Sequence, residues 1–276
     1  MKVIIVNEWL GFFRNKLFLF ISIFFAIFLS FVTYLGILQN NMQNKQQEFA
    51  HDHIRAQWDE MEASNPHSAA HYGSYAFKPL NVLNSIDEGV NSVTGNVLRL
   101  EGHRQNDIVF SEASQSLMIS KFGKLKPSLI FQFIIPLFLI FLSFNSYNSE
   151  RKSGRLKLLL AQNISLKKIL FSKIFSIWLI GVALLFITIL MQLFFNSNFL
   201  DFDIFLRLIL IFVSYSIYYF ILISLTLFLS VAFNSSTASL SITLLTWVFW
   251  TIFFPTIIAN TTEKISPLPT RIEFKE

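Results

Sequence analysis

Five long apolar runs constrain this chain more than any other feature of its sequence. The first run, residues 17–38, contains no charged residue. At about 1.5 Å of rise per helical residue it reaches about 33 Å, enough to cross a hydrocarbon core of about 30 Å. The other four runs cover residues 128–147, 174–195, 205–231 and 239–259. The sequence therefore predicts an all-α polytopic membrane protein with five transmembrane helices.

The composition agrees with this class. Hydrophobic residues make up 53% of the chain and 33 residues are Phe, which is typical of a polytopic membrane protein. Cysteine is absent, so disulfides and thiolate metal sites are excluded. The net charge of +5 comes from Lys and Arg that lie where membrane topology accounts for them. We therefore expect the chain to contact membrane lipid and do not expect it to bind nucleic acid.

The distribution of charge predicts the orientation. The loop 147–173 holds seven Lys or Arg and one acid, and short loops this basic stay in the cytoplasm. Residues 1–16 are also basic and are expected to form a cytoplasmic amphipathic elbow, so the N-terminus is inside. With five spans, residues 39–127 and the tail 260–276 are then extracytoplasmic. Spans two to five occupy residues 128–259, with the basic segment 148–173 among them.

The segment 39–127 differs in composition from the spans. It holds ten of the 17 acids and all five His. Apolar residues at near-helical spacing predict that residues 41–63 continue the first span as a helix, which Asn65-Pro66 should end. Residues 72–100 favour short strands, and residues 106–122 favour a helix leading into span two. We expect a mixed α/β extracytoplasmic domain.

Two pairs of histidines in this segment raise the question of a metal. His51 and His53 are two residues apart, and His67 and His71 are four apart, a spacing that places two imidazoles on one helix face. The chain has no H-E-x-x-H motif, and Pro66 makes a helix at His67 uncertain. Surface or structural histidines are the more common case. The sequence therefore predicts no metal site.

The chain has no means of using nucleotide by itself. It contains no G-x-x-x-x-G-K-[ST] phosphate loop, and its spans hold no Asp, Glu, Lys or His at mid-depth for a proton relay. We expect no catalytic residue and no cofactor in this chain. Polar residues in span four either line a substrate path or bond to neighbouring helices, and both interpretations stay open. They are Ser214, Tyr215, Tyr218 and Tyr219.

The basic segment carries helix signals as well as charge. An apolar run covers residues 156–160, and Ser165 stands as an N-cap before Leu166, Ile169 and Leu170. A loop that only marks topology does not need these helices. Anchoring to anionic lipid is one interpretation, and docking to a cytoplasmic partner is the one we favour.

The pattern E-R-K-x-G-x-L from Glu150, with Leu158 to Leu160, Ser165 and Lys173, resembles the intracellular coupling segment of type 2 ABC transporter permeases. The stretch from Val6 to Lys16 resembles the elbow helix that precedes their first span. Residues 65–73 and 100–106 are similar to a bacterial subgroup with a large ectodomain after span one. The resemblance covers essentially the whole chain.

This resemblance implies the permease subunit of an ATP-driven exporter in the bacterial inner membrane. It implies two partners, a separate cytoplasmic ATPase that holds ATP and magnesium, and a second permease that is identical or paralogous. The alternative is a non-transporting complex that transmits ATPase motion to extracytoplasmic partners. The expected coupling residues are Glu150, Arg151, Gly154, Leu156, Leu159, Leu160 and Lys173. The leucines would contact the ATPase, with Glu150 and Arg151 at the rim. The family has six spans, so either the sequence stops early or a sixth span lies on another polypeptide.

Overall fold

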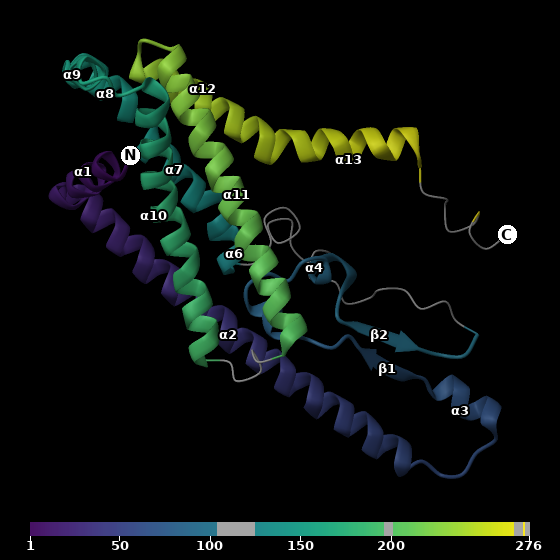
Figure 1. The fold of residues 1–276 in the computed structure, drawn as a ribbon. Coiled ribbons are helices and arrows are strands. Elements are labelled where there is room, and N and C mark those ends of the chain that lie inside the picture. Colours follow the sequence, from purple (N-terminus) through teal and green to yellow (C-terminus); the bar gives the residue numbers. More distant parts are fainter. Residues whose placement is uncertain (104–124, 196–200, 268–272, 274–276) are drawn as a thin grey trace. The chain divides into compact units, whose positions relative to one another are not determined.

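The computed structural model describes residues 1–103, 125–195, 201–267 and 273 (Figure 1). Its longer helices are α1 (Lys2–Arg14), α2 (Lys16–Asp59), α7 (Ile135–Ser143), α10 (Leu166–Phe195), α11 (Phe202–Ala232), α12 (Ser236–Val248) and α13 (Phe254–Ile265). The shorter elements are α3 (Pro66–Tyr72), α4 (Asn91–Thr94), α6 (Pro127–Leu129), α8 (Ser146–Lys152), α9 (Arg155–Ala161), β1 (Ser74–Phe77), β2 (Val97–Leu100) and the 3-10 turn η1 (Val82–Ser85).

Two compact units contain these elements. Unit 1 consists of residues 1–9, 137–178 and 218–276. Unit 2 consists of residues 10–136 and 179–217.

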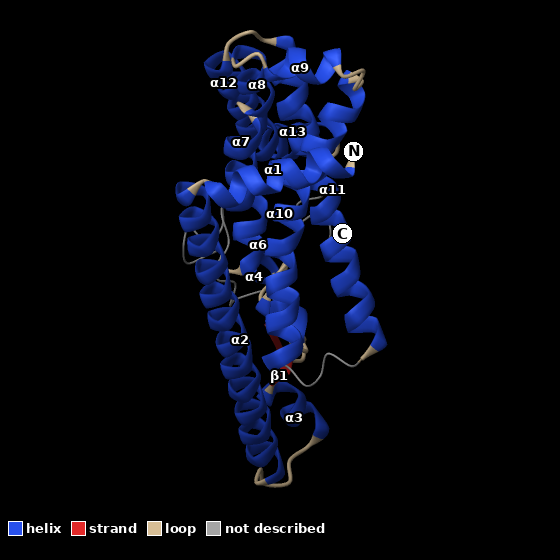
Figure 2. Ribbon diagram, turned by 60° about the vertical axis from the view of Figure 1, so that its left-hand side comes forward, coloured by secondary structure: helices blue, strands red, loops and turns tan. Residues whose placement is uncertain are grey.

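Helices dominate the structure, as Figure 2 shows, and the prediction of an all-α membrane protein is confirmed. Within the described residues, five helical stretches are long and apolar enough to cross a membrane. They are Lys16–Asp59, Pro127–Lys152, Leu166–Phe195, Phe202–Ala232 and Ser236–Ile265. Each contains one of the five apolar runs, and several continue past the apolar run into polar sequence.

The first helix is a separate element that ends before span one. The Asn15 side chain caps α2, because its Oδ1 accepts hydrogen bonds from the Leu17 and Phe18 N–H groups at 3.1 and 3.3 Å. Four apolar side chains of α1 are exposed and recur every three or four residues, which places them on one face: Val3, Val6, Leu10 and Phe13. Such a face suits a helix that lies in a membrane interface.

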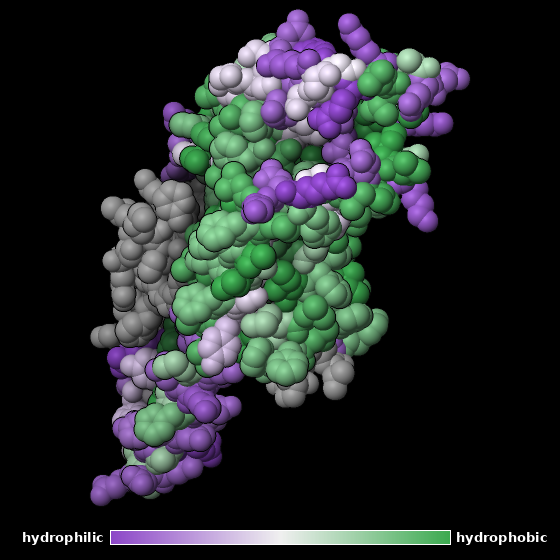
Figure 3. Space-filling model, turned by 90° about the vertical axis from the view of Figure 1, so that its left-hand side faces the viewer, coloured by the Kyte–Doolittle hydropathy of each residue, from purple (hydrophilic) through white to green (hydrophobic). Residues whose placement is uncertain are grey.

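Helix α2 continues well beyond the first span. Its 44 residues correspond to about 66 Å, roughly twice the thickness of a hydrocarbon core. Figure 3 shows hydrophobic surface over the apolar part and hydrophilic surface over the polar part that follows. The predicted continuation is confirmed, but the helix ends at Asp59, before Asn65-Pro66. Asn65 begins α3 instead, and its Oδ1 accepts from the Ser68 N–H at 2.8 Å.

The predicted strands are present. β1 and β2 form an antiparallel pair, with Ser74 opposite Leu100 and Phe77 opposite Val97. The helix predicted over residues 106–122 lies outside the described residues.

Turn η1 contacts α10, the residue that precedes α6, and α2, all within unit 2. The Ser85 hydroxyl accepts a hydrogen bond from Gln192 Nε2 of α10 at 2.7 Å. Buried Lys126, next to α6, forms an ion pair with Glu88 at 2.8 Å and donates to the Asn84 carbonyl. Gly36 of α2 lies so close to the Ser85 carbonyl that no side chain fits between them.

Both spans that contain proline depart from α-helical geometry at the turn before it. A π-helical segment, η3 (Ile130–Ile134), precedes Pro136, and another, η5 (Phe249–Phe253), precedes Pro255. Proline lacks an N–H and its ring clashes with the carbonyl four residues earlier, so the helix widens there. The two prolines therefore account for the departures from α-helical geometry in these spans.

Candidate functional site: the segment between spans two and three

The basic segment folds as helices joined by a tight turn. α8 continues span two, α9 follows it, and α10 begins at Leu166 as the start of span three. Gly154 joins α8 to α9 with a φ of 76°, in the left-handed region that glycine adopts most easily. The Ser165 hydroxyl accepts from the Lys168 N–H at 3.4 Å, so it caps α10 as predicted.

Lys173 lies at the centre of a buried ion-pair cluster. Its side chain is 1% exposed, and its Nζ lies 2.5 Å from Glu8 Oε1 and 3.0 Å from Glu150 Oε1. The same Nζ donates to the Ser146 hydroxyl at 3.2 Å. One ammonium group thus links α1, α8 and α10. A buried cation is tolerated because it is paired and hydrogen-bonded in this way.

Glu150 was predicted to lie at the rim of a partner interface, and the structure places it inside the chain. It is 8% exposed and directed at Lys173. The side chain is therefore used internally, where it holds α8 against α10. Sequence reasoning did not include Glu8 in the site, because nothing local to residue 8 indicates a partner at residue 173.

Arg151 is likewise bonded within unit 1. Its guanidinium donates to Asn148 Oδ1 at 2.6 Å and to the Phe233 carbonyl at 3.1 Å, just past the end of α11. The group also lies 5.6 Å from the centre of the Tyr147 ring. A cation is favourable there, because carbonyls at a helix C-terminus lack intrahelical partners.

Two more hydrogen bonds join the residues just before α8 to helices α11 and α12. Ser230 Oγ donates to the Phe144 carbonyl at 2.8 Å, and Ser236 Oγ donates to Asn145 Oδ1 at 2.7 Å. The two residues that precede α8 are thus hydrogen-bonded to the end of α11 and the start of α12. A displacement of α8 would reach these two spans directly.

The leucines of α9 divide between a buried and an exposed face. Leu156 is 6% exposed and packs inside unit 1, so it is not available to a partner. Leu159 is half-buried, whereas Leu158 and Leu160 are 66% and 45% exposed. Leu158, which was not in the predicted set, has the most exposed of these side chains. Two residues along a helix correspond to about 200°, so with Leu156 inward Leu158 points outward.

Most of the basic side chains of the segment are exposed as well. Five of the seven basic residues of the segment are exposed: Lys152, Arg155, Lys157, Lys167 and Lys168. Lys173 is buried and Arg151 is half-buried. The segment thus presents two exposed leucines, on different sides of α9, together with five exposed basic side chains. Its inner side consists of the ion-paired and hydrogen-bonded groups.

The polar residues of span four have different surroundings. Ser214 is exposed, and the Tyr215 ring packs edge-on against Phe131 at 5.2 Å between centroids in unit 2. In unit 1, the Tyr218 hydroxyl accepts from Trp247 Nε1 at 2.9 Å and Tyr219 is fully buried. These contacts favour a role in helix–helix packing. The lining of a substrate path by these four residues stays a prediction.

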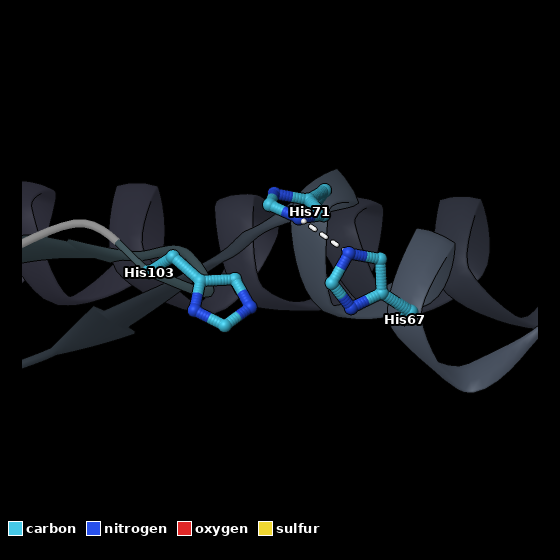
Figure 4. A group of neighbouring side chains, drawn as sticks. All are labelled: His67, His71 and His103. Atoms are coloured by element: carbon cyan, nitrogen blue, oxygen red, sulfur yellow. Dashed lines mark hydrogen bonds between the residues drawn. The ribbon is translucent and has the colours of Figure 1, made fainter.

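One group of side chains in the described residues could hold a metal ion. Figure 4 shows His67 and His71 projecting from α3 toward each other, with His103 beside them from the turn after β2. One nitrogen from each of the three rings lies within 4.8 Å of the others. His51 and His53 on α2 are exposed and not in this group.

Neither a curated protein nor a solved structure gives a match to this chain. A family model, described as ABC-2 family transporter protein, matches residues 2–271. The match spans α1, the five apolar helices and the segment that joins α8 to α10. The chain therefore belongs to the ABC-2 family of transporter proteins, as a multi-pass membrane subunit of an ABC transporter.

Proposed function

We propose that this chain is the permease of an ATP-driven exporter in a bacterial inner membrane. It works with a second permease, identical or paralogous, and with a separate cytoplasmic ATPase that binds ATP and magnesium. The segment 150–173 is where the ATPase docks. The observation that carries this proposal is the exposure of two leucines of α9, Leu158 above all and Leu160, in a segment with five exposed cations.

The outer side of the segment suits contact with the ATPase, and its inner side suits transmission of movement to the spans. Apolar side chains at the centre of an interface supply most of its binding free energy, while charges around them favour encounter and orientation. On the inner side, Arg151 bonds to the Phe233 carbonyl and Lys173 pairs with Glu8. Ser236, at the start of span five, bonds to Asn145, which precedes α8. A push on α9 that displaces α8 would therefore move the elbow helix, the end of span four and the start of span five together.

We expect Leu158→Asp to weaken association with the ATPase at least tenfold, while insertion into the membrane persists. An aspartate would place an unpaired charge in an apolar contact, and truncation of a central anchor alone costs about 1–4 kcal/mol. The measurement is recovery of the ATPase that copurifies with the full-length protein from native membranes. Gln162→Asp is the matched control, because it adds the same charge at an exposed position outside the leucine pair.

Lys168→Ala should have a smaller effect than Leu158→Asp, because a rim charge contributes little to affinity. Full recovery of the ATPase by Leu158→Asp would show that α9 is not the docking element. Equal losses for Leu158→Asp and Gln162→Asp would assign the effect to charge alone.

The proposed orientation places Lys157 in the cytoplasm and the segment 39–127 outside. The chain contains no cysteine, so single cysteines can be introduced at two exposed positions, Lys157→Cys and Ser64→Cys. In intact cells, a membrane-impermeant maleimide should label position 64 and not position 157, and permeabilisation should make both accessible. The reverse pattern in intact cells would invert the proposed topology.

A further inference from the structure

The local structure of α3 directs two imidazoles to one point. Asn65 caps the helix and Pro66 occupies its first turn, so the helix that contains His67 and His71 has a well-defined start. Residues four apart lie on one helix face. The Nε2 atoms of the two rings are 3.3 Å apart.

The strand pair brings a third imidazole to the same place. Gly102 follows β2, and its N–H donates to the Ala70 carbonyl of α3 at 2.9 Å. A Cβ at position 102 would lie 3.3 Å from that carbonyl oxygen, so a larger residue would push the turn and α3 apart by a few tenths of an ångström. His103 then adopts a φ of 62°, a left-handed conformation that is uncommon for a residue with a side chain. Its ring centroid lies 5.4 Å from that of His67 and 5.3 Å from that of His71.

We propose that His67, His71 and His103 form a binding site for a divalent transition-metal cation of the zinc type. Zinc binds imidazole nitrogen at about 2.0–2.1 Å, so two ligands of a tetrahedral site lie about 3.3 Å apart. The His67–His71 separation has this value, and the nitrogen from His103 lies within 4.8 Å of both. A small rotation of the third ring would complete the set.

A hydrogen bond between the two helical histidines does not account for the whole arrangement. Such a bond needs only His67 and His71, whereas the Gly102–Ala70 contact and the left-handed backbone of His103 serve to add a third ring. All three side chains are exposed, so a metal ion could enter from solvent and keep a fourth position for water or another ligand. The ion would join α3 to the turn after β2. This inference does not depend on docking of an ATPase.

The sequence alone predicts no metal here, and the structure changes that interpretation. Two histidines at helical spacing are a weak signal. The third ligand stands 32 positions beyond His71, and it reaches the site only through the register of β1 and β2.

The test uses the full chain, purified in detergent with a tag that contains no histidine, and Zn²⁺ as the ligand. Isothermal titration after chelator treatment should show one Zn²⁺ per chain. His67→Ala, His71→Ala and His103→Ala should each weaken binding by at least about 100-fold, since loss even of groups that only orient ligands costs about 10–100-fold. The double variant His51→Ala/His53→Ala is the matched control and should bind as the wild type does.

Substitution by Co²⁺ supplies a second readout. Tetrahedral coordination gives intense visible d–d absorption, which should appear in the wild type and in the His51/His53 control and be lost in the His103 variant. Absence of stoichiometric Zn²⁺ binding by the wild type would overturn the proposal whatever the variants do. Equal loss in the His51/His53 control would overturn it as well.

Discussion

Lys173→Met is expected to destabilise the protein by about 3–5 kcal/mol, the usual effect of removing one partner from a buried ion pair. The substitution leaves the carboxylates of Glu8 and Glu150 close together, mostly buried and without their cation. The methionine side chain fills similar volume, so the effect reports charge and not a cavity. The measurement is the thermal unfolding midpoint of the purified protein in detergent, together with the yield from membranes.

Lys168→Met is the control, because residue 168 lies on the same helix with its side chain exposed and should change stability by less than about 0.5 kcal/mol. Adding Glu8→Gln and Glu150→Gln to Lys173→Met should recover part of the loss, since no buried charge then lacks a partner. If Lys173→Met unfolds at the same temperature as the wild type, the cluster does not hold α1, α8 and α10 together.

Gly36→Ala is expected to destabilise unit 2, against the trend for helices. Alanine is more favourable than glycine inside a helix by about 1 kcal/mol. At position 36, however, a Cβ would overlap the carbonyl oxygen of Ser85. Relief requires α2 to move away from η1, which would also strain the Gln192–Ser85 hydrogen bond. Overpacking of this kind costs about 1–3 kcal/mol.

Gly11→Ala provides the opposite case within the same chain. Gly11 also lies in a helix, but a Cβ there would meet no atom within 4 Å. It should therefore raise the unfolding midpoint, while Gly36→Ala lowers it. The two variants can be compared in one thermal series in detergent. A rise for both would mean that η1 does not pack against α2 as closely as the structure places it.

The sequence predicted the features that depend on local pattern. An uncharged run such as residues 17–38 can only be accommodated as a helix in a bilayer, because each backbone polar group must be satisfied internally. The polar half of α2, the strands over residues 72–100 and the cap at Ser165 also follow from periodicity and residue type. Each of these elements is present.

Long-range pairings were not predictable in this way. Lys173 and Glu8 are separated by 165 residues, and the sequence around each of them does not indicate that the two side chains pair. The apolar run 156–160 indicates a helix but not which face is inward, so the burial of Leu156 and the exposure of Leu158 could not be predicted. The position of His103 beside His67 and His71 could not be predicted either, because it depends on strand register.

The uninterrupted course of α2 has a mechanical consequence. The residues after the apolar part, from about 39 to Asp59, form an arm of about 32 Å that is rigidly continuous with the first span. If that span tilts by about 10°, the end of the arm moves sideways by about 6 Å, by helix geometry alone. β1 packs along this arm and η1 is fixed near its base. When the first span tilts, β1 would therefore move with the arm while η1 stays near its base, so the residues between them would be sheared. A change in tilt of the first span would in this way displace residues far along the arm.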